Sequence, residues 1–147
     1  MRLRFVFLAA MALGGMTPIE TQEVLDRRQA MMKEMRSELG SFVPMLKGDK
    51  PWEAKAVRGA AERIRADAAR IPTLFPDGTS SDKVFTMALP EIWQRGSEFE
   101  AAAKTTQAAA TRLIELAPGG DKTALSAQVE ILTNSCLECH QAFRLRR

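Results

Sequence analysis

Residues 125–143 read LSAQVEILTNSCLECHQAF, and their periodicity is the clearest structural signal in this chain. Large apolar or reactive side chains recur every three or four residues, a spacing that places them on one face of an α-helix. These positions are Leu125, Val129, Leu132, Cys136, His140 and Phe143. Asp121 precedes them at a place suited to an N-cap, so the sequence predicts a helix that follows Asp121 and includes the whole stretch.

The N-terminal part of the chain carries the start signal of another helix. Thr17 is a candidate N-cap, Pro18 stands at the first helical position, and Glu20 completes a capping box three residues after Thr17. Gly40 is expected to end this helix, because glycine readily adopts the left-handed conformation of a C-terminal cap. The predicted apolar stripe comprises Leu25, Met32, Met35 and Leu39, with Val24 and Met31 beside it.

Two more helices are expected between these ends. The first begins near Asp49 and ends before residues 71–82, where two prolines, a glycine and small polar residues predict a loop. The second opens near Pro90 and runs through the alanine-rich residues 98–117 to the stop signal APGG.

Four amphipathic helices joined by turns bury their apolar stripes best against one another. The expected fold class is therefore all-α, an antiparallel up-down-up-down four-helix bundle. The chain has 147 residues, of which 46% are hydrophobic and 27% are charged, and this composition suits a single folded domain. A helical bundle alone does not specify a function.

Residues 1–15 are expected to be a signal peptide, with an approximate end, and residues 16–147 the mature domain. Arg2 and Arg4 form a basic region, and an apolar run too short to span a bilayer follows, with small residues after it. Without these two arginines, 19 of the 21 basic residues remain against 18 acidic ones, a balance that does not favour binding to nucleic acid.

The two cysteines and the single histidine of the chain lie together in Cys136-Leu137-Glu138-Cys139-His140. The pattern Cys-x-x-Cys-His is the attachment signal for a c-type haem. On a helix, Cys136 and His140 are one turn apart on the same face, so two thioether bonds can hold the porphyrin edge while the imidazole reaches the iron. The motif predicts one covalently bound haem c near the C-terminal helix.

Three other uses of these side chains stay open on the motif alone. A structural zinc site needs a fourth ligand, which only Asp or Glu could supply because no further Cys or His is present. A thioredoxin-like redox pair normally accompanies a βαβ unit, and the helical pattern contains none. A structural disulfide suits an exported protein but gives the neighbouring histidine no role.

Over about residues 17–147 the chain resembles the class II cytochromes c, the family of cytochrome c′ and its low-spin relatives such as c-556. The matching pieces are RRQAMMKEM on the first helix, LFPDG in the loop, LPEIW at the opening of the third helix and CLECHQAFR on the last. In this family the attachment motif lies near the C-terminus. The resemblance implies that Cys136 and Cys139 bind the haem vinyl carbons and that His140 is the proximal iron ligand.

The resemblance implies roles for several more residues around the haem. Arg28 would approach a haem propionate, because a guanidinium fork suits a carboxylate, and Gln29 follows it as it often does in the family. Glu91 would contact the haem edge, and Arg144 would lie near the proximal imidazole. The alternatives are an exposed helix charge for Arg28, a first-turn acid that complements the helix dipole for Glu91, and a solvated tail residue for Arg144.

Met32 falls at the family position that faces the iron opposite the histidine. In cytochrome c′ this residue shields an empty sixth site on five-coordinate iron, whereas in the low-spin relatives a methionine there binds the iron. Thioether ligation raises the reduction potential and suits electron transfer. Methionines at helical spacing, such as Met31, Met32 and Met35, are also common as core filler.

These expectations favour a periplasmic, non-enzymatic c-type cytochrome that carries single electrons between redox partner proteins, with His140 and Met32 as iron ligands. No acid–base pair or nucleophile constellation is recognised in the sequence. The alternative is a five-coordinate cytochrome c′ that binds NO or CO at the distal site. Val24 and Met31, placed off the apolar stripe, would allow a homodimer through the first two helices. Neither a membrane span in the mature protein nor a nucleic-acid partner is expected.

Overall fold

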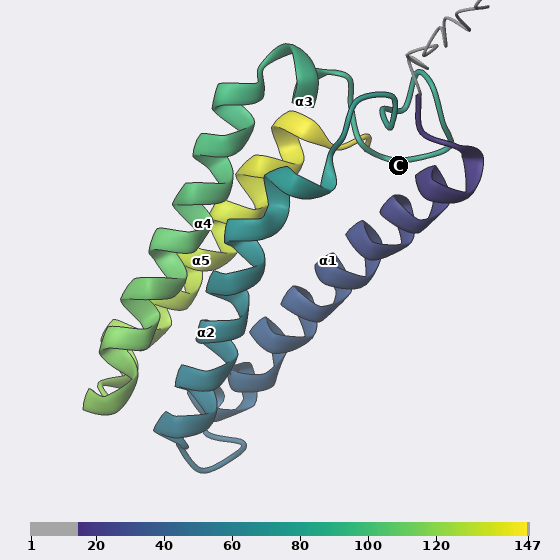
Figure 1. Cartoon of the computed structure of the whole chain (residues 1–147). Coiled ribbons are helices and arrows are strands. Elements are labelled where there is room, and N and C mark those ends of the chain that lie inside the picture. Colours follow the sequence, from purple (N-terminus) through teal and green to yellow (C-terminus); the bar gives the residue numbers. More distant parts are fainter. Residues whose placement is uncertain (1–14, 147) are drawn as a thin grey trace, which may run out of the picture.

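The computed structural model describes residues 15–146, most of which are helical. The α-helices are α1 (Pro18–Lys47), α2 (Ala54–Arg70), α3 (Glu91–Gln94), α4 (Gly96–Leu116) and α5 (Lys122–Phe143), and 3-10 turns cover Ile71–Leu74 and Ala117–Gly119. The four long helices alternate in direction along the chain (Figure 1), which confirms the predicted antiparallel up-down-up-down bundle. Within this part of the chain no helix is both long and apolar enough to cross a membrane. The expected signal peptide lies outside the described residues except for Gly15.

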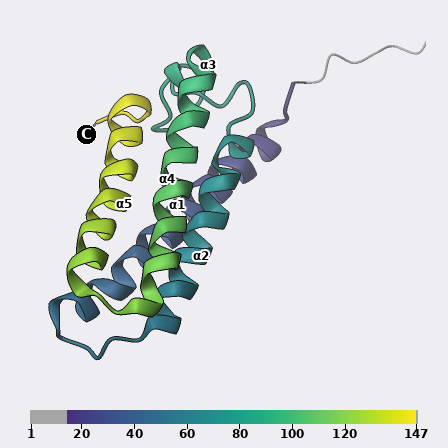
Figure 2. The same cartoon turned by 90° about the vertical axis from the view of Figure 1, so that its left-hand side faces the viewer.

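The four long helices do not contact one another equally. Helix α4 packs extensively against both α2 and α5, whereas α1 packs on α2 and touches α5 only slightly. Figure 1 shows α1 leaning away from the other helices towards its N-terminal end, and Figure 2 shows α4 beside α5 in the perpendicular view. The bundle is therefore least closed between α1 and α5.

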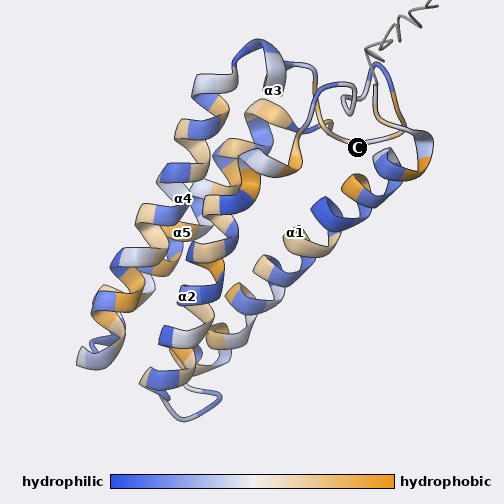
Figure 3. Ribbon diagram, in the orientation of Figure 1, coloured by the Kyte–Doolittle hydropathy of each residue, from blue (hydrophilic) through white to orange (hydrophobic). Residues whose placement is uncertain are grey.

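The core consists of a few large apolar side chains among many alanines. Phe42, Ile64, Leu113, Leu125 and Leu132 are the largest fully buried apolar side chains, and each stabilises the fold by ~1.5–3 kcal/mol relative to an exposed position. Buried alanines on α2 and α4 present little side-chain bulk where these two helices meet. Figure 3 shows hydrophobic and hydrophilic positions alternating along each long helix, as expected for amphipathic helices.

The predicted helix starts are confirmed at two places. The Thr17 side chain accepts a hydrogen bond from the Glu20 backbone N–H, and the Glu20 carboxylate accepts one from the Thr17 backbone N–H at 2.8 Å, which completes the capping box. The Asp121 carboxylate accepts hydrogen bonds from the backbone N–H groups of Thr123 and Ala124, at 2.9 and 3.2 Å. Both contacts satisfy N–H groups that have no partner inside the helix.

The predicted end of the first helix at Gly40 is wrong. Helix α1 continues through Gly40 and ends at Lys47, where Gly48 adopts the left-handed conformation with a φ of 84°. Phe42, which follows Gly40 in the last part of α1, is completely buried. Burial of that phenylalanine outweighs the cost of about 1 kcal/mol for glycine inside a helix.

The other helix boundaries differ from the expectations by a few residues. Helix α2 begins at Ala54, after rather than before Trp52, and no side chain caps its N-terminus. The single helix expected from Pro90 is interrupted at Arg95, whose ψ of 45° separates the short α3 from α4. The loop predicted after α2 is confirmed, apart from its initial 3-10 turn.

The buried stripe of α1 also differs from the expected one. Met31 is only 6% exposed and belongs to the core, whereas Met32 is half-buried at its margin. The placement of Met31 off the core stripe is therefore wrong. Tertiary packing decides this detail, because the side of α1 that is buried depends on how the other helices pack against it.

Candidate haem site

The last two turns of α5 carry the Cys-x-x-Cys-His motif. The helix is continuous from Lys122 to Phe143, so Cys136 and His140 lie one turn apart on one face, as the motif predicted. Both cysteines are free thiols, and Cys136, Cys139 and His140 are all half-buried. The three side chains are thus held on a rigid element, accessible enough to react and partly shielded from water.

Burial sets the protonation of this motif. It raises the pKa of the Cys136 thiol, and it raises the pKa of Cys139 to about 11, with a smaller contribution from Cys136. It also lowers the pKa of His140, and the positive charge of Arg144 lowers it further. At neutral pH both sulfurs are therefore thiols and the imidazole is neutral, the form in which a ring nitrogen can bind a metal.

Arg28 on α1 is buried and bound to the loop that follows α2. Its Nε and Nη2 donate hydrogen bonds to the carbonyl oxygen of Leu74 at 3.1 and 2.9 Å. Nη2 also donates to the Thr79 hydroxyl at 2.8 Å, and Nη1 donates to the Thr79 carbonyl oxygen at 3.3 Å. The guanidinium carbon lies 3.9 Å from the centre of the Phe75 ring. The alternative of an exposed helix charge is wrong, because Arg28 is only 6% exposed.

The charge on Arg28 has no anionic partner among residues 15–146, since every ion pair found there joins other side chains. Burial of this charge lowers the pKa of Arg28 to about 10. A buried cation without a counter-charge is costly, and a nearby carboxylate would offset that cost. Four hydrogen bonds use four of the five N–H groups of a guanidinium, so one is left to bind such a carboxylate. A haem propionate fits this position.

The neighbours of Arg28 on α1 lie in different surroundings. Gln29 is exposed, whereas Met32, one turn after Arg28, is half-buried and packs against the core. Met32 lies on the helix that α5 touches only slightly. The structure therefore places a half-buried thioether at the margin of the core, on the helix that borders the least closed side of the bundle.

Glu91 and Arg144 lie at the end of the bundle that contains the long loop. Glu91 opens α3, and its Oε2 is buried without a hydrogen-bond partner in the described structure. A buried carboxylate oxygen normally has a partner, so this orphaned atom is consistent with a further group at the site. The Arg144 side chain is exposed, and the Arg144 backbone N–H donates to the His140 carbonyl oxygen at 3.1 Å.

An aromatic cluster beside the site was missed by the sequence analysis. The Phe75 ring packs edge-to-face on Phe99 at 4.8 Å between ring centres, and Phe99 packs in the same manner on Phe143 at 5.2 Å. The Trp93 indole N–H donates to the Phe75 carbonyl oxygen at 3.1 Å. Phe75, Trp93 and Phe143 occur in pieces that support the family resemblance, but only the fold brings them together.

Helical bundle and attachment motif together define a small haem protein of the c type, and the buried charge of Arg28 suits its cofactor. The model of the family described as Cytochrome C′ matches residues 23–144. The chain therefore belongs to the cytochrome c′ family, whose members are themselves a standard example of the up-down-up-down bundle. Haem c, covalently attached, is the cofactor of this family and of this protein.

Curated proteins with similar sequences align with this chain over almost their whole length. A cytochrome c-556 of Agrobacterium tumefaciens is 30% identical over 123 residues, which are 84% of this chain and 98% of the relative. A cytochrome c′ of Rhodopseudomonas palustris is 30% identical over 152 aligned residues, covering 100% of this chain and 99% of the relative. The match thus includes both the c-556 and the c′ branches.

Solved structures give the same result for the fold. "Cytochrome c' from Rhodobacter Spheriodes" superposes with a TM-score of 0.77 at 29% identity, covering 86% of this chain and 98% of that one. A nitric oxide complex of a variant of cytochrome c prime from Alcaligenes xylosoxidans superposes with a TM-score of 0.76 at 27% identity. The alignment covers 86% of this chain and 97% of that one.

Proposed function

We propose that this protein is a periplasmic cytochrome that carries single electrons between redox partner proteins. In this proposal Cys136 and Cys139 hold the haem through thioether bonds, His140 binds the iron on one side, and Met32 binds it on the other. The observation that supports electron transfer as the function is the half-buried thioether of Met32 on α1, one turn after the buried Arg28. His/Met ligation raises the potential of a c-type haem, as an electron carrier requires.

The surrounding side chains hold and orient the cofactor in this proposal. Arg28 uses its remaining N–H on a propionate and supplies the positive charge that this carboxylate needs. Gln29, Glu91 and Arg144 complete the contacts at the haem edge and near the imidazole. When bound, the haem supplies one-electron chemistry between ferrous and ferric iron, and the proposal includes no turnover of a substrate.

Location and assembly form part of the same proposal. Residues 1–15 act as the export signal, and residues 16–147 form the mature haem domain. Self-association through α1 and α2 would use exposed apolar side chains, of which Ile19 is 74% exposed. Met31 is unavailable for this contact because it is buried.

A second candidate function is gas binding, with five-coordinate iron that takes up NO or CO on the Met32 side. It is supported by the nitric oxide complexes among the solved cytochrome c prime structures that resemble this chain. Met32 would then shield the open site without binding the iron.

Absorption spectra of the exported holoprotein distinguish the two functions. Met32→Leu removes the thioether and keeps a similar volume, whereas Met31→Leu makes the same change at a neighbouring core position. In an electron carrier, only Met32→Leu converts a low-spin spectrum to a high-spin one and opens the iron to carbon monoxide. High-spin wild-type protein that binds carbon monoxide readily would instead favour gas binding. A colourless product without the mass of a tetrapyrrole would contradict both.

A further inference from the structure

Phe85 is the most exposed large apolar side chain in the described structure, at 99% of its maximum. It lies in the polar loop TSSDKVFTMAL, residues 79–89, between the 3-10 turn after α2 and the start of α3. A fully exposed phenylalanine gains no free energy from burial, so its ring stabilises the protein only when another group covers it.

The loop that carries Phe85 is fixed at both of its ends. At one end, Thr79 is buried and accepts hydrogen bonds from Arg28 on α1. At the other, the Leu145 N–H donates to the Met87 carbonyl oxygen at 2.9 Å, and the Leu89 N–H donates to that of Phe143 at 3.1 Å. The loop therefore connects α1 to the chain immediately after α5. Among the neighbouring long helices of the bundle, these two contact each other least.

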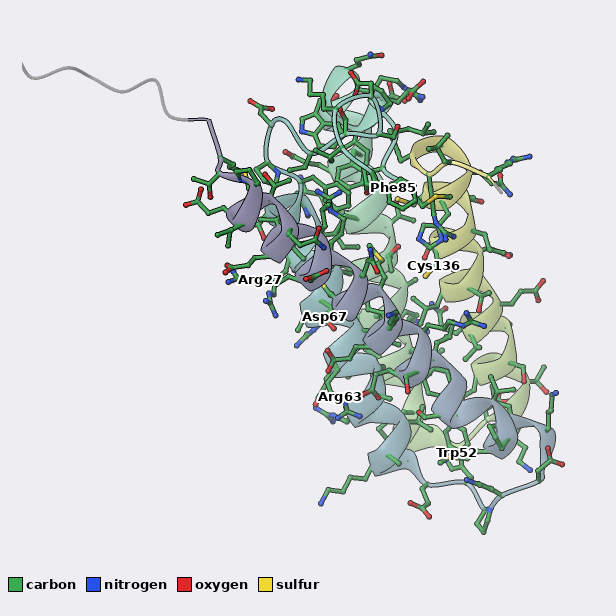
Figure 4. The ribbon with its side chains drawn as sticks, turned by 90° about the vertical axis from the view of Figure 1, so that its right-hand side faces the viewer. Arg27, Trp52, Arg63, Asp67, Phe85 and Cys136 are labelled. Carbon is green, nitrogen blue, oxygen red and sulfur yellow. The ribbon has the colours of Figure 1, made fainter. Side chains whose placement is uncertain are left out.

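Internal bonds hold Phe85 at the tip of this loop. The Ser81 N–H donates to the Ala88 carbonyl oxygen at 2.8 Å, and the Val84 N–H donates to that of Ser80 at 3.0 Å. Figure 4 shows Phe85 and Cys136 on the same side of the molecule, with Phe85 nearer the C-terminal end of α5. The ring is thus presented by an anchored segment on the side where the attachment cysteine lies.

We propose that Phe85 packs against the haem and covers the haem edge on the side between α1 and α5. The inference rests on the proposed attachment at Cys136, Cys139 and His140, and it adds a residue outside the family motif. The haem is the occupant because it is the one large apolar group that attachment at Cys136 brings beside this loop. An aromatic ring on the porphyrin would regain the lost burial and shield the iron from water, which raises the reduction potential.

Nuclear magnetic resonance of the holoprotein tests the contact directly. Unpaired spin on ferric iron displaces the resonances of nearby protons, so the Phe85 ring protons should move between the oxidised and reduced forms. Phe42 provides the internal control, because it lies near the opposite end of α1, where the chain turns into α2. The displacement should be large for Phe85, small for Phe42 and independent of protein concentration.

The reduction potentials of three variants test whether Phe85 raises the potential by shielding the iron from water. Phe85→Ala should lower the reduction potential, because water stabilises the more highly charged ferric form. Phe85→Leu keeps an apolar cover and should retain most of the wild-type potential. Ile131→Ala removes another exposed apolar side chain, on α5 and more than one turn before Cys136, and should leave the potential unchanged.

Three results would overturn the proposal. The first is haem-loaded protein in which the Phe85 resonances do not shift with the redox state and Phe85→Ala has the wild-type reduction potential. This result would contradict the Phe85 contact but leave the proposed haem attachment intact. A displacement that grows with protein concentration would assign Phe85 to a second copy of the chain. Protein that carries no covalent haem would overturn the proposed attachment together with the Phe85 contact.

Discussion

Arg28 on α1 and Thr79 in the loop before α3 are joined by two hydrogen bonds, at 2.8 Å to the hydroxyl and 3.3 Å to the carbonyl oxygen. Both residues are buried, and the Thr79 hydroxyl donates in turn to the Pro76 carbonyl oxygen at 2.8 Å. One side chain of α1 therefore holds the loop that closes this end of the bundle. Its charge has no ion pair among residues 15–146, so in the proposed function a single residue would serve both the fold and the haem site.

Replacement of Arg28 by lysine tests the structural part of this role. Arg28→Lys should lower the free energy of unfolding by ~2–3 kcal/mol, because buried carbonyl oxygens lose charged donors that an ammonium cannot replace in the same geometry. Arg27→Lys is the matched control, since Arg27 is exposed and pairs with Glu23 at 3.5 Å, and it should change stability by less than ~0.5 kcal/mol. Urea unfolding of the holoproteins measures both, and equal effects would contradict the role given to Arg28.

Replacing each of the two glycines near the end of α1 by alanine should change the free energy of unfolding in opposite directions. Gly40 lies inside the helix with open space around it, so Gly40→Ala should stabilise the protein by ~0.5–1 kcal/mol. Gly48 caps the helix with a φ of 84°, and Gly48→Ala should destabilise it by ~1–2 kcal/mol. Thermal unfolding of both variants measures the difference. A stabilising Gly48→Ala would contradict the left-handed cap.

The sequence sufficed where local chemistry decides the structure. Thr17 and Asp121 cap their helices as predicted, because a cap depends on side chains within three residues of it. The bundle followed from the spacing of apolar residues, and the covalent haem c from Cys136, Cys139 and His140 at their fixed spacing on α5. These features need no knowledge of distant contacts.

Features that depend on distant segments were not predictable in the same way. Gly40 resembles a helix end, but the burial of Phe42 two residues later carries α1 past it. The partners of Arg28 are mainly backbone carbonyl oxygens of residues 74 and 79, and a carbonyl leaves no signal in the sequence. Met31 belongs to the core rather than to the side of the helix beside it, and this depends on how the other helices pack on α1.

The ion pair between Glu38 and Arg63 should contribute more than its neighbour within α2. Arg63 donates to both carboxylate oxygens of Glu38, at 2.6 and 2.7 Å, and so joins α1 to α2. Arg58 and Glu62 make one contact of 2.9 Å within α2. Double-mutant cycles with alanine should give a larger coupling free energy for the first pair than for the second, which should be ~0.3–0.5 kcal/mol. Equal coupling free energies for the two pairs would contradict the expectation that contact with both carboxylate oxygens strengthens the ion pair.

Asp67 gives the stability of this protein a pH dependence. It is buried on α2 beside α1 (Figure 4), and burial raises the pKa of its carboxyl, with Glu34 and Glu38 adding to the effect and Arg70 opposing it. The folded state therefore binds this proton more tightly than the unfolded state. Below the ordinary pKa of an aspartate, the carboxyl is neutral in both states and its charge costs nothing. As the pH rises through the raised pKa of the folded state, the cost of the buried charge appears and stability falls.

Asp67→Asn removes that charge with little change of shape. The variant should be more stable than the wild type at pH 7, and its advantage should shrink as the pH falls towards 4, because the wild-type carboxyl then becomes protonated. Glu62→Gln is the control, since it makes the same kind of change on the same helix at a side chain that is 45% exposed rather than buried. Urea unfolding between pH 4 and 7 gives both curves. An Asp67→Asn advantage that grows towards low pH would mean that Arg70, rather than burial, dominates this carboxylate.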